Sequence, residues 1–556
     1  MGITTRWMGT ATTIVLMTSL IVGCAGNGNN AGSNGNSGQT MMNTSSGNAG
    51  GAEASGTLQA TGMPITQEPI ELTFFTGLAG SNGSTPFEER LVYKEMEQLS
   101  NIKVNFQLVP FDGLTEKRNL ALANGDYPDA FFTARVPSAD LMRYGSEGVF
   151  VQLDELLEQY APNLTALMEK YPALRKALTM PNGHIYSMPT FYDPEFLPML
   201  IGTPLWIKQD WLEQLGMDEP QTIDEYYDYL VAVKSTDLNG NGKLDEIPYS
   251  GTGIFPLIEQ LEGAWGVGTR GLGHKFVDVN PENNELRFFR TTDRYKEVLQ
   301  FINKLYAEGL IDPDIFTQDS KTLYAKGSEE RLASTINPNP ITQFNGENYV
   351  GLGALKGPHG DQLYSHIKVP MVWPGAFAIT DKNQHPEATV RWMDYFYGEE
   401  GAKLFFMGKE GESYETTTDG TLEFMDHIKN NPDGLTLDQA LTNYVSWMGG
   451  SYPGYVKVDW FKGSESLPSA IDAGEKAAPH VIDDLWYNFN YTDEETEFMR
   501  TIGADMHTYI REMEAKFING SASFKEWDKY VRTIENMGLE DYMTIYQTAA
   551  DRYNGN

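Results

Sequence analysis

An alternation of strand-like and helical segments near residue 70 limits the possible folds more than any other feature. Residues 70–75 form an apolar, strand-like run, a helical pattern covers 87–99, and a second strand-like run follows at 102–108. A further helical pattern over 114–123 leads to a third strand-like run at 130–132. Strands separated by helices lie parallel in one sheet, because each helix returns the chain to the edge where the strands begin. The order therefore predicts an α/β lobe with a parallel sheet.

The later sequence predicts a chain of more than one lobe. A chain of 556 residues is too long for one compact core, so we expect two lobes. Residues 207–216 have a helical pattern that ends at a glycine. Residues 222–233 have another, which begins with Thr222 and Glu225 at the spacing of a capping box. Further helices are predicted over 386–397, 494–518 and 523–537.

Residues 1–23 are expected to be a signal peptide. Arg6 precedes an apolar run from about Ala11 to Val22, which is short for a membrane span and typical of a signal-peptide core. The run ends at Cys24, the single cysteine of the chain, so no internal disulfide can form. Residues 20–24 resemble the lipobox of bacterial lipoproteins, which implies that Cys24 receives a diacylglycerol. Two acyl chains make a stable anchor, here on the extracytoplasmic face of the cell membrane.

Residues 24–66 are predicted to be the lipidated cysteine and a disordered tether. Between about Ala25 and Gly62 the sequence is mostly Asn, Gly, Ser, Thr and Ala, with almost no charge. Such a segment cannot bury enough apolar surface to offset its ordering entropy. A flexible tether of this kind keeps the folded part of a chain close to the membrane but clear of it.

The segment from Asp237 to Pro248 has the spacing of a calcium-binding loop. Side-chain oxygens alternate at its start, a glycine follows, and two carboxylates come after it. Pro248 stands where an EF-hand carries its bidentate glutamate, so Glu246 is the expected substitute. The alternative is an Asn/Gly turn, which favours the same residues but does not require alternating oxygen donors. The predicted ligands of a structural Ca²⁺ are Asp237, Asn239, Asn241, Lys243 through its main-chain carbonyl, Asp245 and Glu246.

Seven short motifs occur in a specific order along the chain. They lie at 123–129, 183–189, 210–212, 237–248, 386–397, 399–401 and 547–552. Together they resemble family 1 of the extracellular solute-binding proteins, in the large lipoprotein branch that serves carbohydrate importers. The calcium-type loop is similar to that of alginate-oligosaccharide-binding receptors in this branch, and the likeness implies the same six ligand positions.

The resemblance implies a two-lobed, periplasmic-binding-protein-like (type II) α/β fold with the ligand cleft between the lobes. The first lobe is expected at 67–190, with a returning segment near 370–420, and the second at 191–369, which includes the calcium loop. A mainly helical part at 420–556 is expected to pack on both lobes. The implied function is non-catalytic: a monomer captures an oligosaccharide by hinge closure and delivers it to the transmembrane subunits of an ABC importer.

A sugar site needs flat aromatic rings and polar groups that pair with hydroxyls. Candidates are the aromatic and acidic residues in loop-like settings. For each tryptophan the alternative is a core side chain. For the acidic pair that follows Gly125 the alternative is a turn cap, and for the Tyr-Asp pair before Pro194 it is a hinge crossing. The candidate ligand-binding residues are Asp126, Asp129, Tyr192, Asp193, Trp265, Trp373, Trp447 and Trp460.

Charge and motif content exclude several classes of function. The formal net charge is −35, so nucleic acid would be repelled, and a strongly anionic ligand is disfavoured. The scattered histidines lack zinc-site spacing, and no GxSxG, HExxH or P-loop motif is present. A secreted glycoside hydrolase remains the rival, because two suitably spaced carboxylates suffice for that chemistry. A receptor for a peptide or other small solute is the further alternative.

Overall fold

The computed structural model describes residues 58–78, 85–435, 437–446 and 452–555. All of these belong to the compact unit Ala54–Asn556, whereas the unit Met1–Glu53 lies outside the described residues. The predicted signal peptide, Cys24 and most of the predicted tether therefore lie outside them too. Within the described part of the chain, no helix is long and apolar enough to cross a bilayer.

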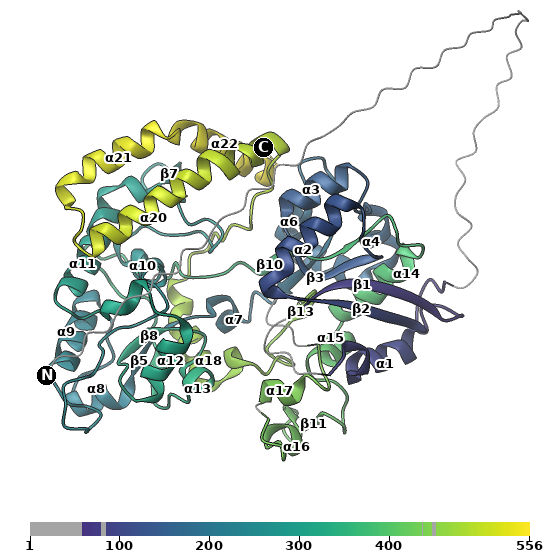
Figure 1. Ribbon diagram of the computed structural model, residues 1–556, viewed down its shortest axis with the longest axis horizontal. Helices are drawn as coiled ribbons and strands as arrows, with labels where there is room; N and C mark the ends of the chain where they lie inside the picture. Colours follow the sequence, from purple (N-terminus) through teal and green to yellow (C-terminus); the bar gives the residue numbers. More distant parts are fainter. Residues whose placement is uncertain (1–57, 79–84, 436, 447–451, 556) are drawn as a thin grey trace, which may run out of the picture. The chain divides into compact units, whose positions relative to one another are not determined.

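The first hydrophobic core surrounds a six-stranded mixed sheet, in the order β13-β4-β10-β3-β1-β2 (Figure 1). Its strands are β1 (Ile70–Leu78), β2 (Ile102–Pro110), β3 (Ala130–Val136), β4 (Met188–Tyr192), β10 (Met371–Ile379) and β13 (Gly454–Val456). β1 is parallel to β2 and β3, and β13 is parallel to β4. β10 is antiparallel to both β3 and β4. The predicted α/β lobe with parallel strands is therefore confirmed.

Helices cover both faces of this sheet because apolar side chains alternate along its central strands. Phe75 and Phe131 pack with Leu141 in one cluster, whereas Phe74 and Phe132 contact Trp392 on the other face. The helices of this lobe are α1 (Leu91–Ser100), α2 (Phe111–Asn124), α3 (Ser138–Ser146), α4 (Asp154–Tyr160), α5 (Pro162–Lys170), α6 (Pro172–Leu178), α14 (Pro386–Asp394), α15 (Glu399–Phe406), α16 (Asp426–Lys429) and α17 (Leu437–Leu441). A small hairpin joins them, β11 (Tyr414–Thr416) with β12 (Leu422–Phe424).

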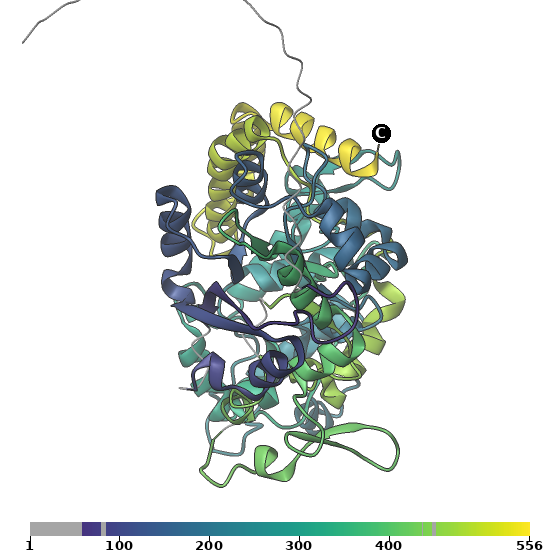
Figure 2. The same ribbon diagram turned by 90° about the vertical axis from the view of Figure 1, so that its right-hand side faces the viewer.

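The second core is mainly helical and contains a short antiparallel sheet, in which β5 (Leu205–Lys208) lies between β8 (Ser334–Ile336) and β9 (Tyr349–Gly351). A hairpin pairs β6 (Val277–Val279) with β7 (Leu286–Phe288). The helices are α8 (Gln209–Leu215), α9 (Ile223–Lys234), α10 (Phe255–Leu261), α11 (Asp293–Ala307), α12 (Ser320–Ser328), α13 (Pro340–Phe344), α19 (Asp493–Phe498), α20 (Ala504–Ile518), α21 (Trp527–Asn536) and α22 (Leu539–Asn554). The helices α20, α21 and α22 lie side by side in both views (Figures 1 and 2).

The chain passes between the two cores three times. Buried residues of the first core come from 65–200 and 367–461, with Tyr487 in addition, and those of the second come from 205–355 and 486–550. The returning segment of the first lobe therefore extends to Phe461, beyond the predicted 420. Two helices lie next to the crossings, α7 (Leu197–Ile201) and α18 (Pro468–Ala477).

Local signals predicted the ends of two helices, and the structure corrects two other predicted helices. Thr222 and Glu225 form the predicted capping box at the start of α9, and Gly125 ends α2 with a φ of 70°. The helix expected from residue 207 begins only at Gln209, because Leu205–Lys208 pairs as β5. The helix expected over 494–518 is interrupted by a π-helical turn at Met499–Gly503.

His274 joins the C-terminal helices to the second core. Its Nε2 lies 2.9 Å from the carbonyl oxygen of Tyr487, and its Nδ1 pairs with the hydroxyl of Tyr546 on α22. Burial lowers the pKa of His274 to about 4. The unfolded chain, with a histidine pKa of about 6.5, therefore binds this proton first as pH falls. Folding stability is lost as pH falls from 6.5 towards 4.

We expect His274→Asn to reduce the loss of stability between pH 7 and pH 5. His366 and His507 contribute to the same loss, because burial lowers the pKa of each to about 4 as well. Through His274 alone, the free energy of unfolding of the wild-type protein should be about 2 kcal/mol lower at pH 5 than at pH 7. The variant should lack this contribution. Urea unfolding at a series of pH values measures the slope independently of any overall destabilisation. His427→Asn, at an exposed histidine, should keep the wild-type slope. Equal slopes in wild type and His274→Asn would show that His274 does not contribute to the pH dependence.

Candidate functional site

The carboxyl ends of the parallel strands define one edge of the large sheet, and the candidate site lies there. β1 ends at Leu78, β2 at Pro110, β3 at Val136 and β4 at Tyr192. β10 begins at this edge because it runs antiparallel, and its Trp373 pairs with Thr190 of β4. Open α/β sheets bind ligands at this edge. Two of the crossings between the cores, after β4 and before β10, also lie here.

Three half-buried side chains from three strand ends meet at this edge, and we call them the edge cluster: Phe111, Arg135 and Trp373. Phe111 directly follows β2, Arg135 is the penultimate residue of β3, and Trp373 lies near the start of β10. The guanidinium carbon of Arg135 is 3.8 Å from the centre of the Phe111 ring and 5.1 Å from that of Trp373. The cation therefore lies against both rings, a favourable cation–π arrangement.

A β-bulge in β3 places Arg135 in the cluster. Phe132 pairs with Phe377 and Val136 with Gly375, so four steps along β3 oppose two along β10. Thr133 and Arg135 have φ angles of 55° and 52°. Non-glycine residues in this left-handed region cost about 1–3 kcal/mol each, and such strain is concentrated at functional sites. Bulges beside binding sites re-aim side chains.

Two glycines on the flanking strands leave room for this bulge. A Cβ on Gly77 of β1 would overlap the carbonyl oxygen of Thr133 and the ring of Phe111. A Cβ on Gly375 of β10 would overlap the carbonyl oxygen of Val136. Backbone atoms cannot move aside as a flexible side chain can, so these positions require glycine.

The structure supports only some of the ligand-binding residues predicted from the sequence. Trp373 belongs to the edge cluster. Asp126 and Asp129 precede β3 and therefore lie at the opposite, amino edge, where Asp129 Oδ2 accepts a hydrogen bond from the Thr73 N–H at 2.7 Å. Their assignment to the cleft is corrected to a strand-joining role for Asp129. The placement follows from the strand direction, which the turn sequence alone does not reveal.

Tyr192 and Asp193 form part of a hinge crossing, the alternative considered for them. Both are buried. The Asp193 carboxylate accepts hydrogen bonds from the Glu195 N–H at 3.0 Å and from the Tyr455 hydroxyl. Burial, together with the Asp193 carboxylate, holds the pKa of Tyr455 well above its ordinary value. This carboxylate therefore joins the strand ends at the hinge, and it is not available to a ligand.

Two of the other predicted tryptophans are core residues. Trp265 is 3% exposed in the second core, where its ring lies 5.5 Å from that of Phe301. Trp460 is 4% exposed and donates to the Tyr455 carbonyl at 3.3 Å. Glycine and acidic neighbours misled the prediction, since burial is decided by tertiary packing. Trp447 lies outside the described residues.

Phe111 and Arg135 were not among the ligand-binding residues predicted from the sequence. A signal for Phe111 was present, because it is the first residue after a parallel strand, at the edge where ligands bind. No local pattern marks Arg135, because the bulge that exposes it depends on pairing with β10, more than two hundred residues later in the chain.

The predicted calcium loop lies largely at the surface, next to the second core, and hydrogen bonds within the loop join its polar side chains. Asp237 Oδ2 accepts the Gly242 N–H at 2.8 Å, and Asn241 Oδ1 accepts the Lys243 N–H at 2.9 Å. Asp245 Oδ1 accepts from the amide nitrogens of Asn239 and Asn241, at 3.4 and 2.9 Å. The hydrogen bond from Asn241 is the main reason that the pKa of Asp245 is lowered, and the hydrogen bond from Asn239 adds to it.

Glu246 supplies the observation that favours a cation here. Its Oε1 accepts from the N–H groups of Leu238 and Asn239, but its buried Oε2 has no hydrogen-bond partner. Among the described residues, no group of three or more His, Cys, Asp or Glu side chains is placed so that it could hold a metal ion. The donor set of the loop instead combines carboxylates with amide and main-chain oxygens, a mixture that suits Ca²⁺.

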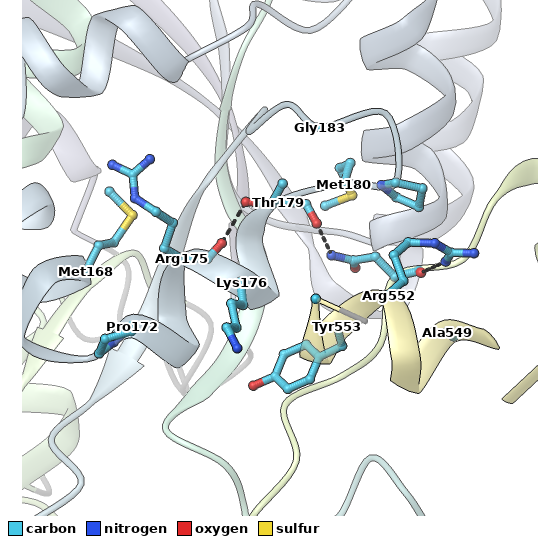
Figure 3. Close-up of a pocket in the computed structure, with 13 residues that line it drawn as sticks. Met168, Pro172, Arg175, Lys176, Thr179, Met180, Gly183, Ala549, Arg552 and Tyr553 are labelled. Atoms are coloured by element: carbon cyan, nitrogen blue, oxygen red, sulfur yellow. Dashed lines mark hydrogen bonds between the residues drawn. The ribbon is translucent and has the colours of Figure 1, made fainter. Parts of the chain in front are cut away.

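A cavity of about 560 Å³ lies between α6 and α22. Arg175 and Lys176 of α6 and Tyr553 of α22 lie around it (Figure 3). Asn490 closes one side by donating to the carbonyls of Ala177 and Thr179, at 2.8 and 2.9 Å. The cavity shares no residue with the edge cluster and contains none of the residues predicted to bind ligand.

We expect Gly375→Ala to destabilise the protein by about 1–3 kcal/mol, as overpacking does, because the bulge must shift. Gly113→Ala is the matched control, since a Cβ at this position of α2 meets open space. The control should stabilise the protein by about 0.5–1 kcal/mol. Chemical denaturation measures both changes. A neutral Gly375→Ala would contradict the requirement for glycine beside the bulge.

Comparisons with known proteins identify relatives over nearly the whole chain. The model of the family described as bacterial extracellular solute-binding protein matches residues 81–403. The fructooligosaccharide ABC transporter substrate-binding protein FusA of Streptococcus pneumoniae serotype 4 is 29% identical over 520 residues, 90% of this chain and 93% of its own. Lipoprotein LipO of Bacillus subtilis is 25% identical over 488 residues, 84% of this chain and 90% of its own.

Solved structures agree with these matches. FusA in complex with kestose has a TM-score of 0.72 and 26% identity, covering 88% of this chain and 100% of that chain. An EF-hand mutant of FusA in complex with fructo-nystose gives the same values. The comparisons confirm the resemblance inferred from the motifs and the two-lobed α/β fold.

Proposed function

The chain belongs to the bacterial extracellular solute-binding proteins, and from this premise we propose that it captures an oligosaccharide and delivers it to an ABC importer. The observation that carries the proposal is the edge cluster of Phe111, Arg135 and Trp373. It lies at the carboxyl edge of the large sheet, where the chain crosses between the two cores. A ligand held at such an edge can contact both lobes and favour their closed arrangement.

The chemistry of the edge cluster suits a neutral sugar. The Trp373 ring offers a flat apolar surface for the C–H face of a sugar ring. The Arg135 guanidinium offers N–H donors to hydroxyl oxygens, which must be paired once they are buried. The formal net charge of −35 disfavours a strongly anionic ligand. The relative FusA is named for fructooligosaccharides, so neutral oligosaccharides are the first class to test.

The proposal is for binding without catalysis. A glycoside hydrolase needs two carboxyl groups on either side of the scissile bond, and the three side chains of the edge cluster include no carboxyl group. The Asp193 carboxylate nearby is buried and accepts the Tyr455 hydroxyl. The full-length relatives carry names of substrate-binding proteins or of a lipoprotein, which supports a receptor.

We also propose that Cys24 anchors the receptor to the outer face of the cytoplasmic membrane. The lipobox-like sequence at 20–24 and the polar segment that follows support this anchor. The relationship to a protein named lipoprotein LipO agrees with it. A tethered receptor remains within reach of the importer in the same membrane.

We further propose that the loop from Asp237 to Glu246 binds a structural Ca²⁺. The ligands would be the side-chain oxygens of five residues and one main-chain carbonyl. They are Asp237, Asn239, Asn241, Lys243 through its carbonyl, Asp245 and Glu246. The unpaired, buried Oε2 of Glu246 supports this set, since a buried carboxylate oxygen needs a partner.

We expect a neutral oligosaccharide to raise the melting temperature of the soluble receptor, in a thermal-shift screen over fructans, other neutral oligosaccharides, uronic-acid oligosaccharides and peptides. A ligand present at 100 times its Kd stabilises the folded state by about 2.7 kcal/mol. Trp373→Ala should weaken binding about 10-fold or more, because the stacking surface is removed.

Tyr227→Ala is the matched control for Trp373→Ala. Tyr227 is a half-buried ring on α9 with the Lys304 ammonium 3.5 Å from its centre, and its loss should leave the affinity unchanged. A shift with peptides alone would replace the oligosaccharide assignment. Chromatography of the bound saccharide after incubation should recover it intact, whereas shortened products would establish a hydrolase.

We expect removal of Ca²⁺ by EDTA to lower the melting temperature, with recovery in excess Ca²⁺. Oligosaccharide binding should persist, because the loop shares no residue with the edge cluster. Asp237→Ala should melt at the same temperature with and without EDTA. Asp419→Ala, at an exposed aspartate that also pairs within a turn, should respond to EDTA as the wild type does. An EDTA-insensitive wild-type melt would refute a structural ion.

A further inference from the structure

The bulge in β3 changes which side chains face each side of the sheet. Phe131 packs in the cluster beneath α2 and α3, and strict alternation would send residues 133 and 135 to the same side. Ala134 and Val136 occupy that cluster instead. The left-handed φ angles of Thr133 and Arg135 produce this shift. Arg135 is thereby released from the core and lies between the rings of Phe111 and Trp373.

Arg118 of α2 holds the main chain of the bulge from the opposite side. Its Nη1 donates to the carbonyl oxygens of Ala134 and Arg135, at 3.1 and 2.7 Å. The side chain is 4% exposed. Its Nε and Nη2 donate to Asn119 Oδ1, at 3.3 and 3.0 Å, and Nη2 lies 3.7 Å from Asp140 Oδ2 in the first turn of α3.

These contacts supply hydrogen-bond donors to the carbonyl groups of Ala134 and Arg135, which lie within the bulge. The bulge interrupts the pairing with β10 between Phe132 and Val136, so carbonyls within it need other donors. A planar guanidinium has five N–H donors in a fixed geometry, so it can contact two carbonyls and two side chains at once. The compact ammonium group of lysine has only three donors and cannot make all of these contacts. Arg118 therefore fixes the left-handed conformation that Arg135 requires.

The placement of Arg135 also defines what it can offer a ligand. A guanidinium held by its face against an aromatic ring directs its N–H groups within its own plane. Such donors suit a pair of adjacent oxygen atoms, as on two neighbouring hydroxyls of a sugar ring. The flanking Trp373 ring provides the apolar surface that the same sugar unit needs.

We infer that Arg135 is a specificity-determining contact for adjacent hydroxyl groups of a neutral sugar unit, and that Arg118 is the positioning residue that holds Arg135 there through the bulge. The inference deepens the proposed oligosaccharide-binding function and rests on it. Arg118 does not touch the sugar; it acts through the main chain of residues 134 and 135.

A double-mutant cycle tests the inference, with kestose as the probe and calorimetry as the measurement. Arg135→Met should weaken kestose binding about 10- to 100-fold, the loss expected for hydrogen bonds from a charged donor. Arg118→Met should cause a loss of similar size. The double variant should bind no more weakly than Arg135→Met alone, because Arg118 has no further contribution once Arg135 is gone.

Two further variants separate positioning from general stability. Arg391→Met is the matched control, since Arg391 also donates to main-chain carbonyls, those of Gln59 and Gly62, in the same lobe. It should lower the melting temperature without changing the affinity. Arg118→Lys keeps the charge and one donor group, so it should recover part of the affinity. It also replaces Arg118→Met in the cycle if that variant does not fold.

Additive losses in the double variant would overturn the inference, because Arg118 would then act independently of Arg135. Unchanged affinity in Arg135→Met would overturn it as well. A larger loss for a uronic-acid trisaccharide than for kestose would overturn it too, because Arg135 would then pair with a carboxylate and not with hydroxyl groups. If the wild type binds no saccharide, the proposed function itself fails. If the wild type binds kestose but the losses of the two variants are additive, only the inference about Arg118 and Arg135 fails.

Discussion

Parallel pairing of β1 with β2 and β3 is the constraint on which the rest of the structure depends. Parallel strands end at one edge, so Phe111, Arg135 and Trp373 come together although they are far apart in sequence. The antiparallel strand β10 returns the chain from the second core to the same edge. Ligand contacts and the hinge therefore share one edge of the sheet, which is why a ligand there can couple to closure.

This edge also depends on close contacts between the backbones of neighbouring strands. Gly77 and Gly375 leave room for the bulge because they have no Cβ atom. Thr133 and Arg135, whose φ angles lie in the left-handed region, form it. At the neighbouring strand ends, the buried Asp193 carboxylate joins β4 to β13 through Tyr455. A rigid sheet edge next to a crossing chain is suited to a receptor, because the contacts stay fixed while the lobes move.

The fold could be predicted from sequence where the signals are local. The strand and helix runs from residue 70 to 132, the capping box at Thr222 and the glycine at the end of α2 all predicted their elements. The site could not be predicted to the same extent. Whether Trp373 is half-exposed and Trp265 buried depends on packing between distant segments, and Arg135 enters the cluster only through pairing with β10.

The proposed function requires the two lobes to close around an intact oligosaccharide. Closure can be measured by small-angle scattering of the receptor, with and without the saccharide that gives the largest thermal shift. A smaller radius of gyration in the presence of ligand, with the saccharide recovered unchanged, is the predicted result. An identical scattering profile at saturating ligand would contradict closure.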